Sequence, residues 1–168
     1  IVRLAAHRDA PTAIRAYTLE NGITRRIESK MPPQMLATWK TAMHVKLDTP
    51  TAREDMEALD LLPKGSVIHS PEYLHGGFDK QYPDVLPPRP TWGTPDELRQ
   101  LIDKVHATGG LFMPYTNHTW WCDQPKGPTF LREGDAPLLR DLGGNTVHEQ
   151  YGPNGGYTIS PFHPAAIA

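Results

Sequence analysis

Two stretches of the sequence concentrate side chains that can hold a polar ligand. The first, HSPEYLHGGFDKQYPDVLPP, covers residues 69–88 and the second, YTNHTWWCD, covers residues 115–123. Sugars present apolar C–H faces that stack on aromatic rings, and hydroxyl groups that pair with carboxylates, amides and imidazoles. Side chains of these types are Tyr73, His75, Asp79, Tyr82, Asp84, Asn117, His118, Trp120, Trp121 and Asp123. Together they favour a carbohydrate site.

Each of these residues also has a structural explanation. Tyr82 and the neighbouring prolines can pack the loop, and Asp79 and Asp84 can cap turns near the Gly76-Gly77 pair, because polar loop residues commonly serve turns. The adjacent tryptophans can simply cover the core. The two stretches taken together point to a ligand site more strongly than any single residue does.

A metal site is a second interpretation, since His69, His75, Asp79 and His118 are of metal-binding types. Their spacing matches no common ligand pattern, and the glycine pair after His75 opposes a helix that would place His75 and Asp79 on one face. A metal-dependent hydrolase built on His75, Asp79 and His118 therefore stays an alternative. We expect no metal and no cofactor.

Nucleophilic chemistry has weaker support. Cys122 lies beside Trp121 and Asp123, which favours a raised pKa and an inert thiol. Glu72, Asp79 and Asp84 are candidates for general acid–base work. Sequence alone places no two of these carboxylates at the ~5 Å or ~6.5–9.5 Å separation that glycoside hydrolysis requires, so the catalytic residues stay unknown.

Lys46 is a further candidate for the site. It ends an expected strand over residues 41–47, from which its ammonium group can point toward a ligand. A solvated strand end is the alternative explanation.

Composition limits the function classes. The chain has 168 residues, enough for one domain with a real core, and 17 basic against 19 acidic residues leave a formal net charge of −2. This balance argues against nucleic acid as a partner. The apolar runs fall far short of the ~20 residues of a spanning helix, so we expect no membrane insertion. A single cysteine does not identify the compartment, and the localisation stays unknown.

The spacing of apolar residues and breakers predicts a series of elements. We expect helices over residues 10–21 and 51–62, strands over 41–47, 66–69 and 111–115, and a short helix near 136–142. The clearest element is TPDELRQLIDKVHATGG, in which Thr94 and Glu97 form a capping box and Pro95 occupies the first helical position. Strand, helix and strand in this order predict a parallel sheet.

The loops are unequal in length. Long connections follow the strands that end near His69 and Tyr115, whereas the turn at Gly109-Gly110 is minimal. Both long loops leave the carboxyl ends of parallel strands, which is the edge where barrels and open α/β sheets bind ligands. The polar and aromatic stretches are therefore expected to meet at that edge.

The motifs resemble a known group of enzymes. GGFDKQYPDVLPP, followed by GTPDELRQLIDKVHATGGLFMPYTN and TWW, resembles the amino-terminal part of TIM-barrel glycoside hydrolases, especially bacterial members near the α-galactosidase and endo-α-N-acetylgalactosaminidase group. The resemblance covers most of residues 10–121. It implies that Asp79 hydrogen-bonds substrate hydroxyls, with Tyr73, His75, Asn117 and Trp120 or Trp121 lining the pocket. It also implies a nucleophile at the end of a fourth strand, which this sequence does not reach.

The resulting expectation is an α/β fold, a fragment of a (β/α)8 TIM barrel with parallel strands and long βα loops. Residues 1–40 would be a lead-in helix and linker, and residues 41–168 the first strand–helix units. The function would be that of a glycosidase acting on an oligosaccharide, polysaccharide or glycoconjugate. This segment would supply substrate-binding loops without a complete catalytic pair, and the rest of the parent barrel would be its partner. A non-catalytic carbohydrate-binding module is the other alternative.

Overall fold

The structure is a computed structural model that describes residues 6–167 of the chain. The chain divides into two compact units, residues 1–40 and residues 41–168. The helices are α1 (Ala10–Glu20), the short 3-10 helix η1 (Ile27–Ser29), α2 (Pro33–Thr41), α3 (Ala52–Leu59), α4 (Pro95–Ala107), α5 (Pro128–Glu133) and α6 (Pro164–Ile167). The strands are β1 (His44–Lys46), β2 (Val67–Ser70), β3 (Leu111–Pro114), β4 (Trp120–Cys122), β5 (His148–Tyr151) and β6 (Asn154–Thr158).

The first unit is a set of helices with little internal core. Asp9 caps α1 by accepting a hydrogen bond from the Thr12 backbone N–H at 2.9 Å, and Gly22 follows the helix with a φ of 67°. The helix predicted over residues 10–21 is therefore confirmed to within a residue. No residue of α1 is buried, and its apolar side chains Ile14 and Tyr17 are exposed.

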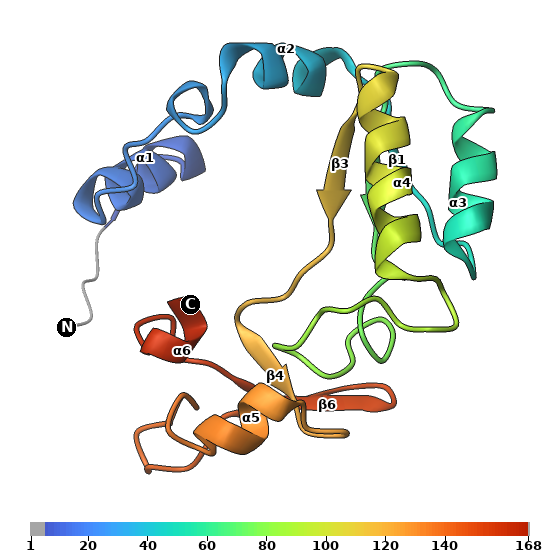
Figure 1. Cartoon of the computed structure of the whole chain (residues 1–168). Helices are drawn as coiled ribbons and strands as arrows, with labels where there is room; N and C mark the ends of the chain where they lie inside the picture. Colours follow the sequence, from blue (N-terminus) through green and yellow to red (C-terminus); the bar gives the residue numbers. More distant parts are fainter. Residues whose placement is uncertain (1–5, 168) are drawn as a thin grey trace. The chain divides into compact units, whose positions relative to one another are not determined.

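The second unit is built around a three-stranded parallel sheet in the order β1-β2-β3. Helix α3 connects β1 to β2 and helix α4 connects β2 to β3, which is the βαβ arrangement that the sequence predicts (Figure 1). Thr94 and Glu97 form the expected capping box at the start of α4. Lys104 of α4 donates a hydrogen bond to the Met56 backbone carbonyl of α3 at 2.7 Å, which ties the two helices together.

The register of the strands separates the two faces of this sheet. Val45, Ile68 and Phe112 lie in one row across the strands and pack in the core that includes Leu101 of α4. Because side chains alternate between faces along a strand, the next row, Lys46, His69 and Met113, points to the face that carries no helix. That second face is only partly covered.

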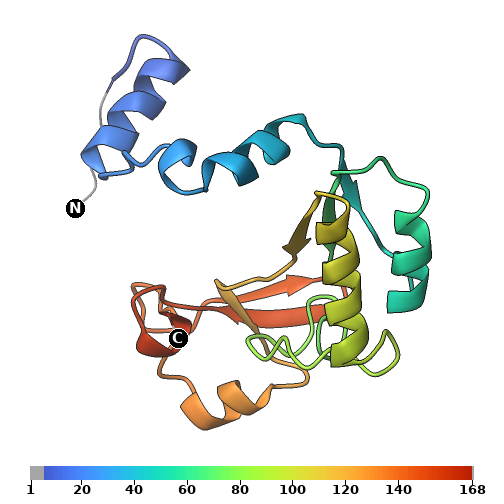
Figure 2. The same cartoon turned by 45° about the horizontal axis from the view of Figure 1, so that its top comes forward.

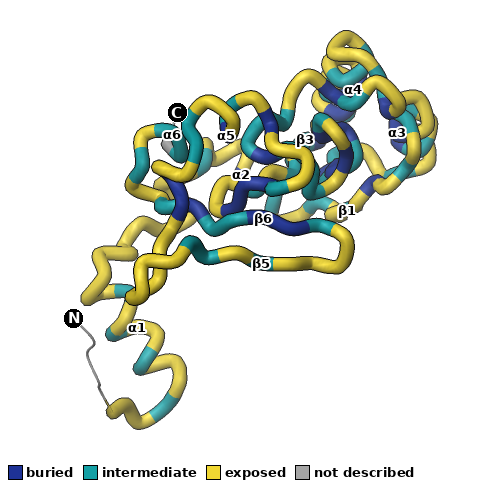
Figure 3. Tube along the Cα trace, turned by 90° about the horizontal axis from the view of Figure 1, so that it is seen from below, coloured by how far each residue is buried: buried dark blue, intermediate teal, exposed yellow. Residues whose placement is uncertain are grey.

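An antiparallel sheet follows the parallel one and was not predicted. Its strands lie in the order β4-β6-β5. It lies beyond the carboxyl end of β3 (Figures 1 and 2). One of its faces packs on a second core of Trp121, Phe130, Leu138 and Ile159. The middle strand β6 is buried at its centre, whereas β5 is largely exposed (Figure 3).

Of two predictions over the irregular parts of the sequence, one was too long and the other was wrong. The strand expected over residues 41–47 is shorter, because α2 runs to Thr41; Pro33 begins this helix, a position that proline favours, rather than breaking the chain. The helix expected near residues 136–142 does not form. Leu139 instead donates its N–H to the Thr158 carbonyl and accepts from Val147 N–H, so this segment is extended.

Length and hydrophobicity of the helices bear on membrane insertion. None of the helices among residues 6–167 is long and apolar enough to cross a lipid bilayer.

Candidate functional site

The candidate site is a group of side chains at the carboxyl edge of the parallel sheet, on the face without helices. We define this carboxyl-edge cluster as Lys46, His69, Phe78, Asp79 and Tyr115. Lys46 ends β1, His69 is the last but one residue of β2, and Tyr115 directly follows β3. Phe78 and Asp79 come from the long loop over residues 71–94, so three consecutive strands and one loop converge.

The long loop is held in place by its own side chains and by the strand ends. Tyr73 is buried, and its hydroxyl donates to the Tyr115 backbone carbonyl at 3.0 Å. Its ring packs edge-on against Trp92, with 6.3 Å between ring centroids. Arg89 pairs with Glu72 and donates its backbone N–H to the Tyr73 carbonyl. Asp79 therefore stands on an anchored loop rather than on a free one.

Asp79 connects the two long loops. Its backbone has a φ of 51°, in the left-handed region that aspartate and asparagine tolerate better than most residues other than glycine. The Tyr115 hydroxyl donates to Asp79 Oδ1 at 3.3 Å, and the Cys122 thiol donates to the Asp79 carbonyl at 3.2 Å. Gln81, two residues further along the same loop, has a φ of 58°, so this segment turns through two left-handed residues.

Aromatic rings surround this carboxylate. The ring of Tyr115 lies 5.0 Å from that of Phe78 and 5.8 Å from that of His69, measured between centroids. Lys46 Nζ lies 5.8 Å from the centroid of the Phe78 ring and pairs with Asp48 at 2.8 Å. Phe78 keeps 39% of its surface exposed. The cluster thus combines a carboxylate, a hydroxyl, an ammonium group and accessible rings.

Two tyrosine hydroxyls near Asp79 stay protonated at neutral pH. Burial, followed by the Asp79 charge, raises the pKa of Tyr82 far above its usual range. Partial burial, followed again by Asp79, raises the pKa of Tyr115. Both groups are therefore hydrogen-bond donors, and the buried Tyr82 hydroxyl has no hydrogen-bond acceptor among the described residues.

The tryptophans predicted to line the site lie in the cores instead. Trp120 is 3% exposed and Trp121 is 1% exposed. Trp120 lies directly over Gly156, where an added Cβ would come within 2.4 Å of its Cε2 atom. The two residues alternate along β4, so one faces the core beneath the parallel sheet and the other faces the second core. The tryptophans and Tyr73 are buried and pack beneath the candidate site. The Tyr73 hydroxyl already donates to the Tyr115 carbonyl, so it is not available to a ligand.

Other predicted residues are engaged locally. The imidazole Nδ1 of His75 lies 3.0 Å from the Pro87 carbonyl. Asn117 Oδ1 accepts hydrogen bonds from the backbone N–H and the hydroxyl of Thr119, and His118 is exposed. His75, Asp79 and His118 do not form a metal site, since no three His, Cys, Asp or Glu residues among those described are grouped to hold an ion.

The other acid–base candidates have structural roles. Asp84 accepts hydrogen bonds from the Thr129 backbone N–H and hydroxyl, so it caps α5 from the neighbouring loop. Glu72 forms the ion pair with Arg89. Burial raises the pKa of the Cys122 thiol to about 11, in agreement with the expected inert cysteine.

Sequence reasoning missed Phe78 and Tyr115 as members of the carboxyl-edge cluster, and Asp48 as the ion-pair partner of Lys46. Tyr115 could have been found, because it lies two residues beyond Met113 and so shares the face of His69 once the parallel register is assumed. The positions of Phe78 and Asp48 depend on how loops fold, and loops show no regular spacing of apolar residues in the sequence.

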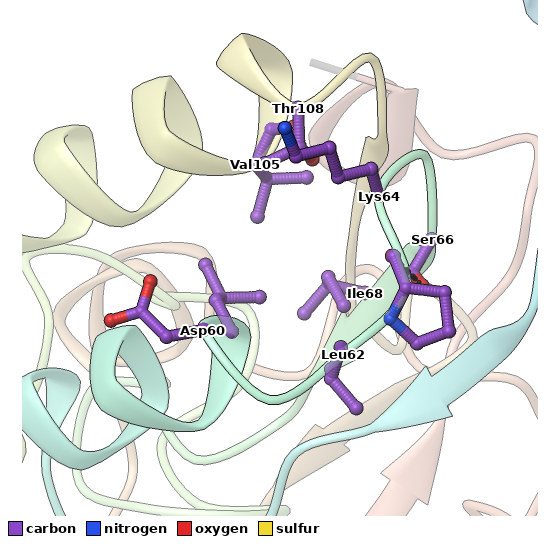
Figure 4. A pocket seen from close by; sticks show the side chains of 9 residues that line it. Asp60, Leu62, Lys64, Ser66, Ile68, Val105 and Thr108 are labelled. Carbon is purple, nitrogen blue, oxygen red and sulfur yellow. Dashed lines mark hydrogen bonds between the residues drawn. The ribbon is translucent and has the colours of Figure 1, made fainter.

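A separate hollow of about 140 Å³ lies at the opposite, amino-terminal edge of the sheet (Figure 4). Its floor is formed by the core residues Ile68 and Val105, and Lys64, Asp60 and Thr108 surround its opening. Open parallel α/β sheets bind ligands at the carboxyl ends of their strands, so we do not place the site at this edge.

Comparison with known proteins finds similarity in fold only. No family model matches the sequence, and no curated protein sequence matches it significantly. An alpha-N-acetylgalactosaminidase from Bifidobacterium bifidum is similar in structure, with a TM-score of 0.65 and 17% identity over 88% of this chain and 28% of that protein for a quadruple mutant. Its ligand-free form has a TM-score of 0.63 and 20% identity, over 94% of this chain and 30% of that protein.

A further solved structure, of a candidate alpha-amylase from Salmonella typhimurium, is similar with a TM-score of 0.51 and 22% identity. It is matched over 77% of this chain and 22% of its own length. This chain therefore spans less than a third of the proteins it matches. The mixed α/β arrangement with a parallel three-stranded sheet is one that glycosidases also contain.

Proposed function

We propose that the chain forms the first strand–helix units of a (β/α)8 barrel in a glycoside hydrolase, and that it binds a saccharide at the carboxyl-edge cluster. The observation that carries this proposal is the hydrogen bond between Asp79 and the Tyr115 hydroxyl. It joins the loops that follow two neighbouring parallel strands, at the edge where such sheets bind ligands.

The exposure of the sheet supports a barrel. All-parallel sheets normally have both faces covered. Here the helices cover one face. On the other face Val67 is buried, whereas Lys46 and His44 are exposed and Met113 is half-buried. The strands β1 and β3 each have a single neighbour in the sheet. Closure with further strands would cover this face and both edges.

The chemistry of the cluster fits a sugar. A carboxylate such as Asp79 accepts hydrogen bonds from ligand hydroxyls, and the protonated Tyr115 hydroxyl can both donate and accept. The exposed ring of Phe78 offers an apolar surface for the C–H face of a pyranose. Lys46 adds a donor at the end of β1. No cofactor is required for this recognition.

Hydrolysis would proceed through an oxocarbenium-like transition state with two carboxylates. In our proposal Asp79 recognises the substrate, and the acid and the nucleophile come from other strands of the barrel. Because the solved relatives include an alpha-N-acetylgalactosaminidase, α-linked N-acetylgalactosaminides are the first substrates to test. Maltooligosaccharides are the second, because of the amylase-like neighbour.

The test is a titration of the protein, expressed from its whole reading frame, with N-acetylgalactosamine and with maltotriose. We expect Asp79→Asn to weaken binding of the recognised sugar about 10-fold, because a neutral amide replaces a carboxylate and hydrogen bonds to charged groups contribute roughly 1.5–3 kcal/mol. Asp103→Asn, on the exposed side of α4, is the matched control and should bind like the parent protein.

Equal affinity of the parent protein and Asp79→Asn would remove Asp79 from the site. Hydrolysis of the bound glycoside distinguishes the glycosidase from a non-catalytic carbohydrate-binding module. Binding with no release of sugar, in the protein from its whole reading frame, would favour the binding module.

A further inference from the structure

The hairpin of β5 and β6 brings a second set of side chains to the face that contacts Asp79. Across the antiparallel sheet, Cys122 pairs with Gly156, and Gly156 pairs with Glu149. Residues directly opposite each other share a face, so Glu149 lies on the same face as Cys122, whose thiol donates to the Asp79 carbonyl. Tyr151, two residues further along β5, shares this face as well.

Tyr151 is held in one orientation although it is exposed. Its ring packs edge-on against Trp120, with 5.8 Å between centroids, and its hydroxyl donates to Glu149 Oε2 at 2.9 Å. Even so, 58% of its surface is accessible. An exposed ring that is fixed by two contacts loses little side-chain entropy when a ligand stacks on it.

The backbone around Tyr151 is also constrained. A tight turn with Gly152 at a φ of 56° joins it to its strand partner Asn154, and the Gln150 amide donates to the Gly152 carbonyl at 2.8 Å. Trp120, against which the ring packs, is itself buried over Gly156. The ring therefore rests on a buried residue of the sheet.

Tyr151 and Asp79 lie on either side of the same buried support. The Tyr82 ring lies 6.3 Å from that of Trp120, between centroids, and the Cys122 thiol contacts Asp79. The bond to Glu149, followed by other effects that include the Asp79 charge, raises the pKa of the Tyr151 hydroxyl. Cys122, Glu149 and Tyr151 thus share one face of the antiparallel sheet, and Asp79 contacts that face through its backbone carbonyl.

We propose that Tyr151 is an aromatic platform that stacks on a second saccharide unit of the ligand, and that Glu149 positions this ring by holding its hydroxyl. This inference rests on the proposed saccharide site and specifies its substrate as one of at least two units. Asp79 holds one unit and Tyr151 the next. Neither Glu149 nor Tyr151 stands out in the sequence, because both follow an irregular stretch.

The experiment compares short and long ligands on the protein from its whole reading frame. The first series is N-acetylgalactosamine and disaccharides that carry it at the non-reducing end, and the second is glucose, maltose and maltotriose. We expect Tyr151→Ala to weaken binding of the longer ligands roughly three- to tenfold and to leave the monosaccharide unchanged, since an aromatic contact contributes about 0.5–1.5 kcal/mol.

Two further variants separate stacking from structure. Tyr151→Phe keeps the ring but loses the bond to Glu149 that positions it, so its affinity for the longer ligands should lie between those of the parent protein and Tyr151→Ala. Tyr151→Leu keeps an apolar contact with Trp120 but has no flat face, so it should bind like Tyr151→Ala. A similar loss for the monosaccharide and the longer ligands would indicate a structural role only and overturn the inference.

The outcomes also separate this inference from the proposed function. If the parent protein binds no sugar of either series, the proposed saccharide site and the Tyr151 platform are both wrong. The other outcome is that the parent protein binds the sugars through Asp79 while Tyr151→Ala retains full affinity for the longer ligands. In that case the Tyr151 platform is wrong, and the saccharide site at the carboxyl-edge cluster is retained.

Discussion

The two edges of the parallel sheet differ in the length of the connections that the chain makes there. At the amino-terminal edge the chain enters β2 and β3 through short turns around Gly65 and Gly110, and the core residues Ile68 and Val105 line the hollow there. At the carboxyl edge the chain leaves in long loops that carry Asp79 and Tyr115. The amino-terminal edge is therefore constrained by close packing, while the long loops of the carboxyl edge leave room for ligand-binding groups.

The largest effect should come from crowding the amino-terminal edge. A Cβ at Gly110 would lie 2.4 Å from the Ser66 carbonyl oxygen, so Gly110→Val forces the backbone apart. We expect the free energy of unfolding to fall by about 3 kcal/mol, measured by urea denaturation. Any folded fraction should keep its affinity for sugar.

The neighbouring glycine provides the control for that change. Gly109 has a φ of 78° and no atom within 4 Å of an added Cβ, so Gly109→Ala meets strain without a clash. We expect a cost of about 1 kcal/mol. A loss for Gly109→Ala as large as that for Gly110→Val would contradict the importance of close packing at this edge.

The pH dependence of stability should come from a carboxylate on the helix side of the sheet. Burial raises the pKa of Asp55, although Thr49 donates to its Oδ1 at 2.6 Å and Ser70 to its Oδ2 at 3.4 Å. The folded state therefore binds this proton more tightly than the unfolded state. Its contribution to stability is favourable at low pH and is lost as the pH rises through the folded-state pKa.

Asp55→Asn removes this titration. Urea denaturation between pH 3 and pH 8 should show a decline in stability with rising pH for the parent protein that is smaller in the variant, on the order of 1 kcal/mol over the range. Identical pH profiles would mean that Asp55 has an unperturbed pKa when folded.

The sequence predicts the two edges unequally. The capping box at Thr94, the apolar row ending at Val105 and the Gly109-Gly110 stop are local signals, and they predict α4 and β3 within a residue or two. The parallel pairing follows from the order of these elements. Asp79 could be selected because it lies in a long loop at the expected edge, and in the structure it contacts Tyr115 at that edge.

The remaining structure depends on contacts between distant segments. Helix α5 is capped by Asp84 from the loop after β2, and the antiparallel sheet needs Gly156 for Trp120 to lie on it. Neither of these contacts produces a regular spacing of residues that could be recognised in the sequence. The aromatic types of Trp120 and Trp121 suit a sugar site and a core equally well, and burial in the structure distinguishes the two.

At the carboxyl edge a smaller effect is expected from the loss of one hydroxyl. Tyr115→Phe keeps the ring contacts with Phe78 and His69 but removes the donor to Asp79. Affinity for the recognised sugar, measured by calorimetry, should fall roughly three- to tenfold, with a change in stability below about 1 kcal/mol. Unaltered affinity would place the ligand away from Tyr115.

The smallest effect should come from Lys46. Its ion pair with Asp48 is half-exposed, and such pairs contribute little. Lys46→Met should therefore change sugar affinity by less than about twofold in the same calorimetric titration. A much larger loss would indicate that the ammonium group contacts an anionic group of the ligand.

The central claim, that a saccharide binds at the carboxyl edge, is tested most directly by backbone amide NMR shifts during titration with N-acetylgalactosamine and with maltotriose. We predict that one of these sugars changes the chemical shifts of the amides around Asp79 and Tyr115 and leaves the chemical shifts around Gly65 and Gly110 unchanged. Shifts confined to the amino-terminal edge, or no shifts with either sugar, would contradict it.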